Sequence, residues 1–324
     1  MVEMIVIGAG PAGLSCAIEA KKAGLGAIVL DKGSALDSIR RFPTNVIWFS
    51  TPELLEIGDV PFVISMVRPT RVDVLNYYQK VCDHYQLDIR PFNRVEEVVR
   101  EDRKFVVKTG NGKSYSARNV VVATGYYDNP NMLGVPGESL SNVFHHYREP
   151  FEFFGCDVAV VGGRNSAVEA ALDLYRHGVR VTLIHRGKKL SDGVKYWILP
   201  DIENRIKAGE VKALFESRVR EIKGGSITVE TPDGVQNLKS DFTFVLIGFH
   251  PDTTHLERYG VQINPETMAP CFDEKTLETN VAGLYVAGSI VAGKNNNKVF
   301  VENGRTHGPV IVSAILSRQR QEMS

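Results

Sequence analysis

Two glycine-rich turns are the parts of this sequence whose residue types and spacing could bind a dinucleotide. The first turn, GAGPAG at residues 8–13, matches G-x-G-x-x-G, follows an apolar strand at residues 4–7 and opens a helical segment at residues 14–22. Its glycines let the backbone approach a pyrophosphate, and a helix N-terminus stabilises the charge. Asp31 follows the next apolar strand, at residues 26–30, where a carboxylate can accept a hydrogen bond from a ribose hydroxyl.

The second turn, GGRNSA at residues 162–167, has Arg164 in place of the middle glycine. An arginine there costs backbone proximity but offers a charged donor to a phosphate. Arg186, Lys188 and Lys189 come after the strand that follows. A carboxylate at that point favours a free ribose 2′-hydroxyl, whereas cations favour a 2′-phosphate, so this cluster predicts NADPH rather than NADH. The competing interpretation is that these are solvated surface charges.

Two dinucleotide sites in one chain predict an exchange of electrons between two cofactors. The pair that makes chemical sense is a nicotinamide that donates hydride and a flavin that accepts it. We therefore expect an oxidoreductase that uses NADPH and FAD. A non-enzymatic role is disfavoured because two such cofactors have little use except to exchange electrons.

The strand–turn–helix–strand unit around the first turn is repeated around the second, and each copy continues into a hairpin and a strand that ends in glycine. One more apolar strand, ending at Gly288, and a helix over about residues 301–322 follow the second copy. Because they are too small to stand alone, they must rejoin an existing domain. The sequence thus predicts an α/β fold of two Rossmann-like dinucleotide-binding domains. The NADPH domain (residues 118–248) is inserted in a discontinuous FAD domain (residues 1–117 and 249–324).

The composition of the chain argues against several classes of binding partner. Lys plus Arg and Asp plus Glu each total 38, so the formal net charge is zero, and 43% of the residues are hydrophobic. This balance predicts neither nucleic acid nor membrane as partner, and no apolar run approaches the ~20 residues of a membrane span. Cys16, Cys82, Cys156 and Cys271 are too far apart for a CxxC pair or zinc-ligand spacing. With no secretory signal pattern at the N-terminus, we expect a cytoplasmic protein with reduced thiols and no metal.

Four motifs in order, GAGPAG, VVVATG at residues 120–125, GGRNSA and LYVAG ending at residue 288, resemble the low-molecular-weight thioredoxin reductases over nearly the whole chain. The resemblance implies FAD in the split domain, NADPH in the inserted domain and a homodimer. Where those enzymes carry a redox CxxC dithiol, this chain has HHYR at residues 145–148. Without a thiolate to form a mixed disulfide, thioredoxin cannot be reduced by the usual relay. Ser289 also replaces the aspartate that binds the flavin ribityl chain in that family.

A closer resemblance is to the bacillithiol disulfide reductase family, which lacks the CxxC. It is carried by RRFPTNVIWFSTPELLEIGDVPF, ATGYYDNPNMLGVPGE, GGRNSAVEAAL and KYWILPDIENRI. The likeness implies an NADPH-dependent FAD enzyme that acts on a low-molecular-weight disulfide. The cysteine that this family often carries in a GPCG turn is here Ala12. Cys16 lies one helical turn later and is a minor catalytic candidate, with a small core residue as the favoured interpretation.

Several further candidates have weaker support. His145 and His146 could exchange a proton with a substrate thiolate, because imidazole titrates near neutral pH, or they are linker residues. An aromatic side chain of residues 48–51 could cover the flavin ring, and core packing is the competing explanation. The last helix, after residues 298–302, should direct its N-terminal amides at the electron-rich end of the reduced flavin. Glu302 stands where thioredoxin reductases carry a glutamine.

Motifs and resemblance together predict two groups of cofactor-binding residues. The FAD group comprises Gly8, Gly10, Pro11, Ala12, Gly13, Asp31, Lys32, Arg40, Phe49, Thr51, Ala123, Thr124, Gly125, Gly288, Ser289, Val301 and Glu302. The NADPH group comprises Gly162, Gly163, Arg164, Asn165, Ser166, Arg186, Lys188 and Lys189.

Two alternative functions use the same pair of domains. One is a ferredoxin or flavodoxin reductase, in which a small redox protein takes electrons at the flavin. The other is a flavin monooxygenase, and a specific absence disfavours it. The F-x-G-x-x-x-H motif of those enzymes would need phenylalanine and glycine where Ser139 and Ser141 precede His145.

Overall fold

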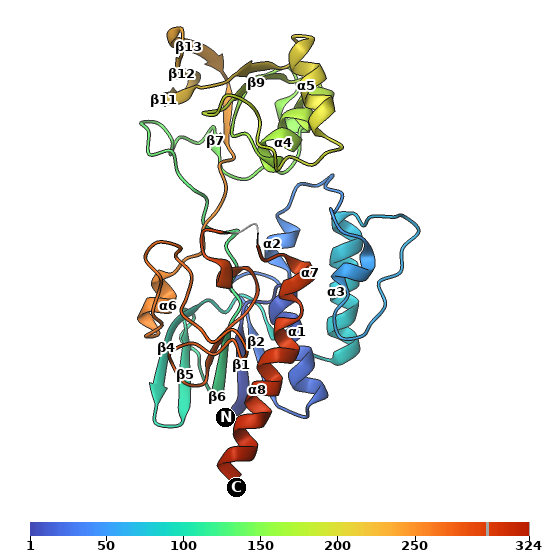
Figure 1. Ribbon diagram of the computed structural model, residues 1–324, viewed down its shortest axis with the longest axis vertical. Coiled ribbons are helices and arrows are strands. Elements are labelled where there is room, and N and C mark those ends of the chain that lie inside the picture. The colour runs from blue at the N-terminus through green and yellow to red at the C-terminus, as the bar shows by residue number, and fades with distance from the viewer. Residues whose placement is uncertain (296–297, 324) are drawn as a thin grey trace. The chain divides into compact units, whose positions relative to one another are not determined.

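The computed structural model describes residues 1–295 and 298–323 and divides into two compact units (Figure 1). Unit 1 comprises Met1–Arg41, Val46–Asn129 and Phe249–Ser324. Unit 2 comprises Phe42–Asn45 and Pro130–Gly248. Each unit has its own sheet and its own core.

The sheet of unit 1 has the strand order β3-β2-β1-β6-β5-β4, and β15 also pairs with β6. Pairing is parallel from β3 through β6 to β15 and antiparallel among β4, β5 and β6. Ile5 and Ile7 of β1 pack with Val120 and Val122 of β6 in a core that includes Leu256. The strands are β1 (Val2–Ile7), β2 (Ala27–Leu30), β3 (Asp88–Arg90), β4 (Val95–Glu101), β5 (Lys104–Thr109), β6 (Ser114–Val122) and β15 (Leu284–Val286).

Helices of unit 1 cover this sheet: α1 packs against α3 and α8, and α6 packs against β4 (Figure 1). Proline at the first position of α1 suits a helix start, and α3 begins with a reciprocal cap in which Thr70 and Asp73 each accept the other's backbone N–H. None of the helices in the described ranges combines the length and apolar composition of a membrane span. The helices are α1 (Pro11–Lys22), α2 (Asp37–Arg40), η1 (Pro52–Leu55), α3 (Arg71–Tyr85), α6 (Thr254–Arg258), η3 (Gly288–Ala292), α7 (Val301–Gly304) and α8 (His307–Met323).

Unit 2 has a parallel sheet of order β10-β9-β8-β14-β7 and a second, antiparallel sheet of order β11-β12-β13. Alternate residues of β8 serve two cores, because side chains of a strand point to opposite faces. Val160 packs with Leu172 of α4, whereas Val161 packs with Val219 and Ile227 of the antiparallel sheet. The elements are β7 (Val143–Phe144), η2 (Phe151–Phe153), β8 (Asp157–Val161), α4 (Asn165–Arg176), β9 (Arg180–Ile184), α5 (Leu199–Lys207), β10 (Lys212–Leu214), β11 (Arg218–Lys223), β12 (Gly225–Thr231), β13 (Gly234–Ser240) and β14 (Phe242–Val245).

The two units repeat one layout, which agrees with the predicted α/β fold of two Rossmann-like domains. The order β3-β2-β1-β6-β15 in unit 1 corresponds to β10-β9-β8-β14-β7 in unit 2. The last strand of each series is out of sequence order with the strands beside it. In unit 1 it follows the inserted segment as β15, and in unit 2 it precedes the other strands as β7.

The structure differs from the sequence-based expectation at the first crossing and at the last helix. The chain enters unit 2 after Asn129, not near residue 118, because β6 continues to Val122 in register with β1. Residues 42–45 also cluster with unit 2, where the Thr44 N–H donates to the Arg148 carbonyl oxygen at 2.7 Å. The expected helix over about 301–322 is divided into α7 and α8.

Candidate functional site

The glycine turn after β1 forms a close-packed backbone cradle in unit 1. Gly8 has φ of +112°, and a Cβ there would lie 2.4 Å from the Ala123 carbonyl oxygen. A Cβ at Gly13 would lie 2.0 Å from the Gly8 carbonyl oxygen, so both positions require glycine. A Cβ at Gly10 would meet none of the described atoms within 4 Å. Gly10 therefore borders open space beside Pro11, at the helix start where a pyrophosphate would be stabilised.

Asp31, directly after β2, is connected to this turn by its carboxylate. Oδ2 accepts the Ala9 N–H at 2.7 Å, and Oδ1 accepts the Gly33 N–H at 2.8 Å. Burial raises the pKa of Asp31, and the two backbone donors oppose that rise. A carboxylate has about four lone-pair sites, so Asp31 can still accept a hydrogen bond from a ribose hydroxyl.

Ser34 is a further candidate that the sequence analysis missed. Its hydroxyl oxygen is buried and has no hydrogen-bond partner among the described residues. The Leu36 N–H donates to the Ala9 carbonyl oxygen at 3.1 Å, so the loop that carries Ser34 lies beside the glycine turn. Because buried polar groups are nearly always satisfied, this hydroxyl indicates a polar ligand at the cradle. No motif signals a serine in such a loop.

The predicted residues Lys32 and Arg40 belong to a network of charges next to the cradle. Lys32 Nζ lies 2.8 Å from Asp128 Oδ2, and Arg41 also binds Asp128. Arg40 and Arg41 both bind Asp37, each at 2.7 Å. Burial opposes ionisation of Asp128, but Lys32 and Arg41 hold its pKa below the ordinary value. Both predicted cations are therefore already paired with carboxylates.

The ends of β6 and β15 complete the cradle. A Cβ at Gly288 (φ +74°) would lie 2.8 Å from the Ala12 Cβ, and one at Gly125 (φ +69°) would lie 3.5 Å from the Ser289 hydroxyl oxygen. Thr124, which precedes Gly125, is exposed. The structure thus brings together predicted residues from three distant parts of the sequence.

Predicted residues of segment 48–51 meet α7 near this edge. The Ser50 hydroxyl donates to Glu302 Oε1, which joins two groups 252 residues apart. Ser50 is buried, whereas the Phe49 side chain is 57% exposed. Thr51 lies directly before η1, and Val301 begins α7. The open turn at Gly10, the unpartnered hydroxyl of Ser34 and the carboxylate of Asp31 fit a bound FAD.

The glycine turn of unit 2 is similarly close-packed, since a Cβ at Gly162 would lie 2.5 Å from the Leu246 carbonyl oxygen. Arg164 and Ser166 at the start of α4 are exposed. The side chain of Asn165, the first residue of α4, is engaged by a neighbouring loop. Its Oδ1 accepts the N–H of Lys195 at 2.8 Å, and its Nδ2 donates to the carbonyl oxygen of residue 193 at 3.1 Å. Asn165 therefore holds the loop at residues 191–195 against the turn.

His185 is a second residue whose role was missed, although it begins the HRGKK stretch. It follows β9 as Asp31 follows β2. Its ring packs against the turn, since a Cβ at Gly163 would lie 2.3 Å from His185 Nδ1. Burial, and then the neighbouring Arg186, lower the pKa of His185. A neutral ring at this position places no negative charge against a ribose 2′-phosphate.

The three predicted cations after β9 differ in their surroundings. Lys189 Nζ is paired with Asp192 Oδ1 at 2.6 Å on the exposed surface. Arg186 and Lys188 are exposed and form no ion pair with another described residue. These two cations are therefore the ones available to a phosphate.

The candidate catalytic side chains are placed as follows. His145 Nε2 lies 3.1 Å from Glu138 Oε1, and the Glu138 carboxylate also accepts the N–H groups of residues 133 and 134. His146 is partly buried. Cys16 is fully buried in α1, and this burial raises the pKa of its thiol to about 12. The structure therefore favours Cys16 as a core residue, because a thiol with that pKa is not a nucleophile at neutral pH.

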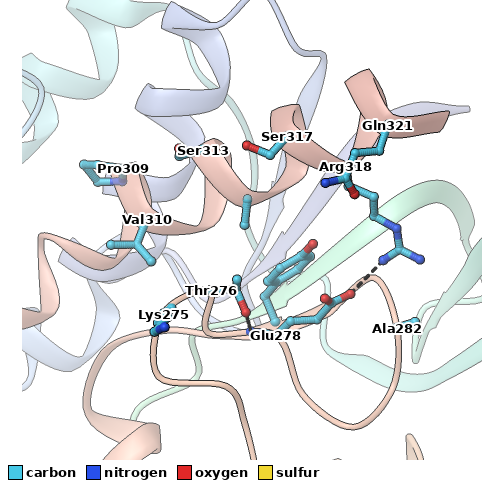
Figure 2. Close-up of a pocket in the computed structure, with 12 residues that line it drawn as sticks. Lys275, Thr276, Glu278, Ala282, Pro309, Val310, Ser313, Ser317, Arg318 and Gln321 are labelled. Carbon is cyan, nitrogen blue, oxygen red and sulfur yellow. Dashed lines mark hydrogen bonds and ion pairs between the residues drawn. The ribbon is translucent and has the colours of Figure 1, made fainter. Parts of the chain in front are cut away.

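A groove on unit 1 runs along α8 (Figure 2). Figure 2 shows Arg318 of α8 reaching across it to Glu278, with 2.7 Å between Arg318 Nη1 and Glu278 Oε1. None of the predicted cofactor-binding residues lines this groove. The groove therefore contains none of the residues on which the predicted cofactor chemistry depends.

Comparison with known proteins finds a match over residues 5–288 to the family model described as pyridine nucleotide-disulphide oxidoreductase. The chain is 42% identical to bacilliredoxin reductase Bdr of Bacillus subtilis over 97% of this chain and 98% of that protein. The solved structure of bacillithiol disulfide reductase Bdr from Bacillus cereus is 41% identical, with a TM-score of 0.95 over 98% of this chain and 99% of that one. A ferredoxin–NADP reductase of Ignicoccus hospitalis is 26% identical over 95% of this chain and 96% of that protein.

Proposed function

The chain belongs to the pyridine nucleotide-disulphide oxidoreductase family, and on that premise we propose that it reduces a low-molecular-weight thiol disulfide of the bacillithiol type. It is an FAD-dependent oxidoreductase with FAD and NADPH as cofactors, as the sequence predicted. The balanced reaction is NADPH + H⁺ + RSSR → NADP⁺ + 2 RSH. The observation that carries the proposal is the near full-length match to proteins named for reductase activity on bacilliredoxin and on bacillithiol disulfide.

Unit 1 would hold FAD through backbone and a few polar side chains. The open turn at Gly10 would bind the pyrophosphate at the start of α1. Asp31 and Ser34 would form hydrogen bonds with polar groups of the nucleotide. Ser289 lies beside Gly125 at the end of β6, and Ser50 binds the Glu302 carboxylate. When bound, FAD supplies a two-electron carrier between nicotinamide and disulfide.

Unit 2 would hold NADPH at its own glycine turn. Arg164 and Ser166 are exposed at the start of α4, and Arg186 with Lys188 would bind the ribose 2′-phosphate. His185 orients this region by packing its neutral ring on the turn. The exposed arginine and lysine give the site its preference for NADPH over NADH.

The cysteines support direct reduction of a small disulfide. Cys16 and Cys82 are buried, Cys156 is partly exposed, Cys271 is exposed, and all are free thiols. The residues that the structure describes therefore contain no dithiol to relay electrons to a protein disulfide. We accordingly expect a substrate small enough to reach the flavin.

Further partners and location follow from the same proposal. Resemblance to the thioredoxin reductases supports a homodimer. Unpaired thiols support a cytoplasmic location, where a reducing environment keeps them free. A small redox protein with an exposed centre is the competing electron acceptor, and the reductase of Ignicoccus hospitalis is the relative that favours it.

Rapid mixing of the NADPH-reduced enzyme with candidate acceptors tests the proposal. Separate mixtures would contain bacillithiol disulfide, oxidised thioredoxin, ferredoxin, flavodoxin or oxygen alone. We expect bacillithiol disulfide to reoxidise the enzyme well above the rate with oxygen, and thioredoxin to have no such effect. Acceleration by ferredoxin or flavodoxin, with none by any disulfide, would replace the proposed function with electron transfer to a redox protein.

A further inference from the structure

The junction between β15 and η3 is held by a histidine from the start of α8. The Gly288 N–H donates to His307 Nδ1 at 3.0 Å, across 19 residues of sequence. A Cβ at Gly288 would lie 2.8 Å from the Ala12 Cβ, and one at Gly304 would lie 3.4 Å from the Gly288 Cα. His307 therefore contacts the backbone at the point where the first glycine turn, β15 and α7 meet.

The protonation state of His307 decides whether this hydrogen bond exists. A neutral imidazole has one acceptor nitrogen, whereas an imidazolium has two donors and cannot accept from Gly288. Burial lowers the pKa of His307 below the ordinary 6.5, so the ring is neutral at physiological pH. Protonation would place an N–H group on Nδ1 directly opposite the Gly288 N–H, so that two donors would face each other.

Burial alone shifts the pKa of His307, with no contribution from a neighbouring charge among the described residues. Glu19 of α1 is paired with Lys22, Glu302 of α7 accepts from Ser50, and Arg305 after α7 donates to the backbone of residues 53 and 56. The titratable groups on the helices and the strand around the junction are Cys16, Glu19, Lys21 and Lys22 of α1, Glu53 of η1, Tyr285 of β15, Glu302 of α7, the adjoining Arg305, and Arg318, Arg320 and Glu322 in the C-terminal half of α8.

We propose that His307 is a positioning residue that fixes Gly288 and Ser289 for FAD, and that protonation of its ring weakens the hold of unit 1 on FAD. Acidification removes the acceptor of the Gly288 N–H and leaves that group unsatisfied. The proposal rests on FAD as the cofactor of the proposed function. Its test measures FAD retention without any disulfide, so its failure would leave the proposed substrate untouched.

The experiment follows FAD release from the holoenzyme between about pH 8 and about pH 5.5 by the fluorescence of the freed flavin. In the wild type, we expect the apparent Kd for FAD to rise about three- to tenfold on acidification, which is the range for one lost hydrogen bond. His307→Asn keeps a side-chain acceptor near the place of Nδ1 but does not titrate, so retention should remain high and lose its pH dependence. His307→Leu has no acceptor and should release FAD more readily at every pH.

A matched control and a second measurement keep the test decisive. His84→Asn changes an exposed histidine at the end of α3 and should leave the pH profile of the wild type unchanged. If His307→Asn showed the wild-type pH profile, another group would be responsible and the proposal would fail. It would also fail if His307→Leu retained FAD as the wild type does. Should His307→Leu not fold, thermal unfolding of His307→Asn with and without added FAD, at both pH extremes, gives the same decision.

Discussion

Replacement of Arg186 by alanine should reduce the preference of the enzyme for NADPH over NADH. Arg186 is exposed and is not committed to an ion pair among the described residues, so its guanidinium is available for a bidentate contact with a 2′-phosphate. Lys189 carries the same charge but is already paired with Asp192 at 2.6 Å. The two substitutions remove equal charge from the same loop and therefore form a matched pair.

The structure sets the size of the expected effect. A hydrogen bond to a charged group contributes about 1.5–3 kcal/mol, and solvent around an exposed arginine favours the lower end. Arg186→Ala should therefore lower kcat/KM for NADPH about tenfold. Lys189→Ala should cost about threefold or less, because Lys189 must first give up Asp192. Neither substitution should change kcat/KM for NADH, which lacks the 2′-phosphate.

Steady-state kinetics with both nicotinamides, at low and high salt, provide the assay. The ratio of kcat/KM for NADPH to that for NADH is the deciding quantity, because it cancels any general loss of activity. High salt should reduce the wild-type ratio and have little effect on that of Arg186→Ala. An unchanged ratio in Arg186→Ala would refute the assignment, as would a larger loss in Lys189→Ala.

Further predictions concern thiols, stability and the flavin cradle. Cys16→Ala should leave the rate of flavin reduction by NADPH within about twofold in single-turnover mixing, because a thiol with a pKa of about 12 supplies no thiolate; abolished reduction with FAD still bound would assign it a catalytic role. Glu138→Gln should lower the free energy of unfolding at neutral pH by about 1–3 kcal/mol. The pKa of Glu138 is depressed in the fold, so its contribution is present above the ordinary value of 4.5 and is lost as pH falls; an equal deficit in urea titrations at about pH 3 and pH 7 would contradict this. Ser50→Ala leaves Glu302 without its donor and should weaken FAD binding a fewfold in equilibrium titrations, whereas unchanged affinity would place the pair outside the cradle.

Local signals in the sequence were sufficient to predict the two glycine turns and the strands around them. Apolar runs and glycines predict β1, α1 and β2 closely, and α1 begins earlier than expected only because Pro11 suits the first position of a helix. The crossing expected near residue 118 lies inside a strand. The expected hairpin ended at residue 117 and a new segment began there, whereas β6 runs without a break from Ser114 to Val122. Asn119 is buried in this strand and donates to the Glu3 carbonyl oxygen at 3.1 Å.

Contacts between distant residues account for what sequence reasoning missed. The bond between Ser50 and Glu302 and that between Gly288 and His307 exist only once the chain has folded. The Ser34 hydroxyl can be recognised only in the folded structure, where it is a rare buried polar group without a hydrogen-bond partner among the described residues. A motif names residue types at fixed spacing, and none of these relationships has a fixed spacing.

β15 belongs to the sheet of unit 1 but follows unit 2 in the sequence, and this order has a consequence for synthesis on the ribosome. Residues 130–248 of unit 2 leave the exit tunnel as one continuous stretch, whereas unit 1 lacks β15, η3, α7 and α8 until residues 284–323 are translated. α1 must wait for α8, since the Ser15 hydroxyl donates to the Arg305 carbonyl oxygen at 2.6 Å beside the α1–α8 packing. The nascent chain therefore completes unit 2 before unit 1, although unit 1 begins first. A ribosome stalled once residue 248 has left the exit tunnel should display a protease-resistant unit 2 beside an N-terminal segment that is still digested.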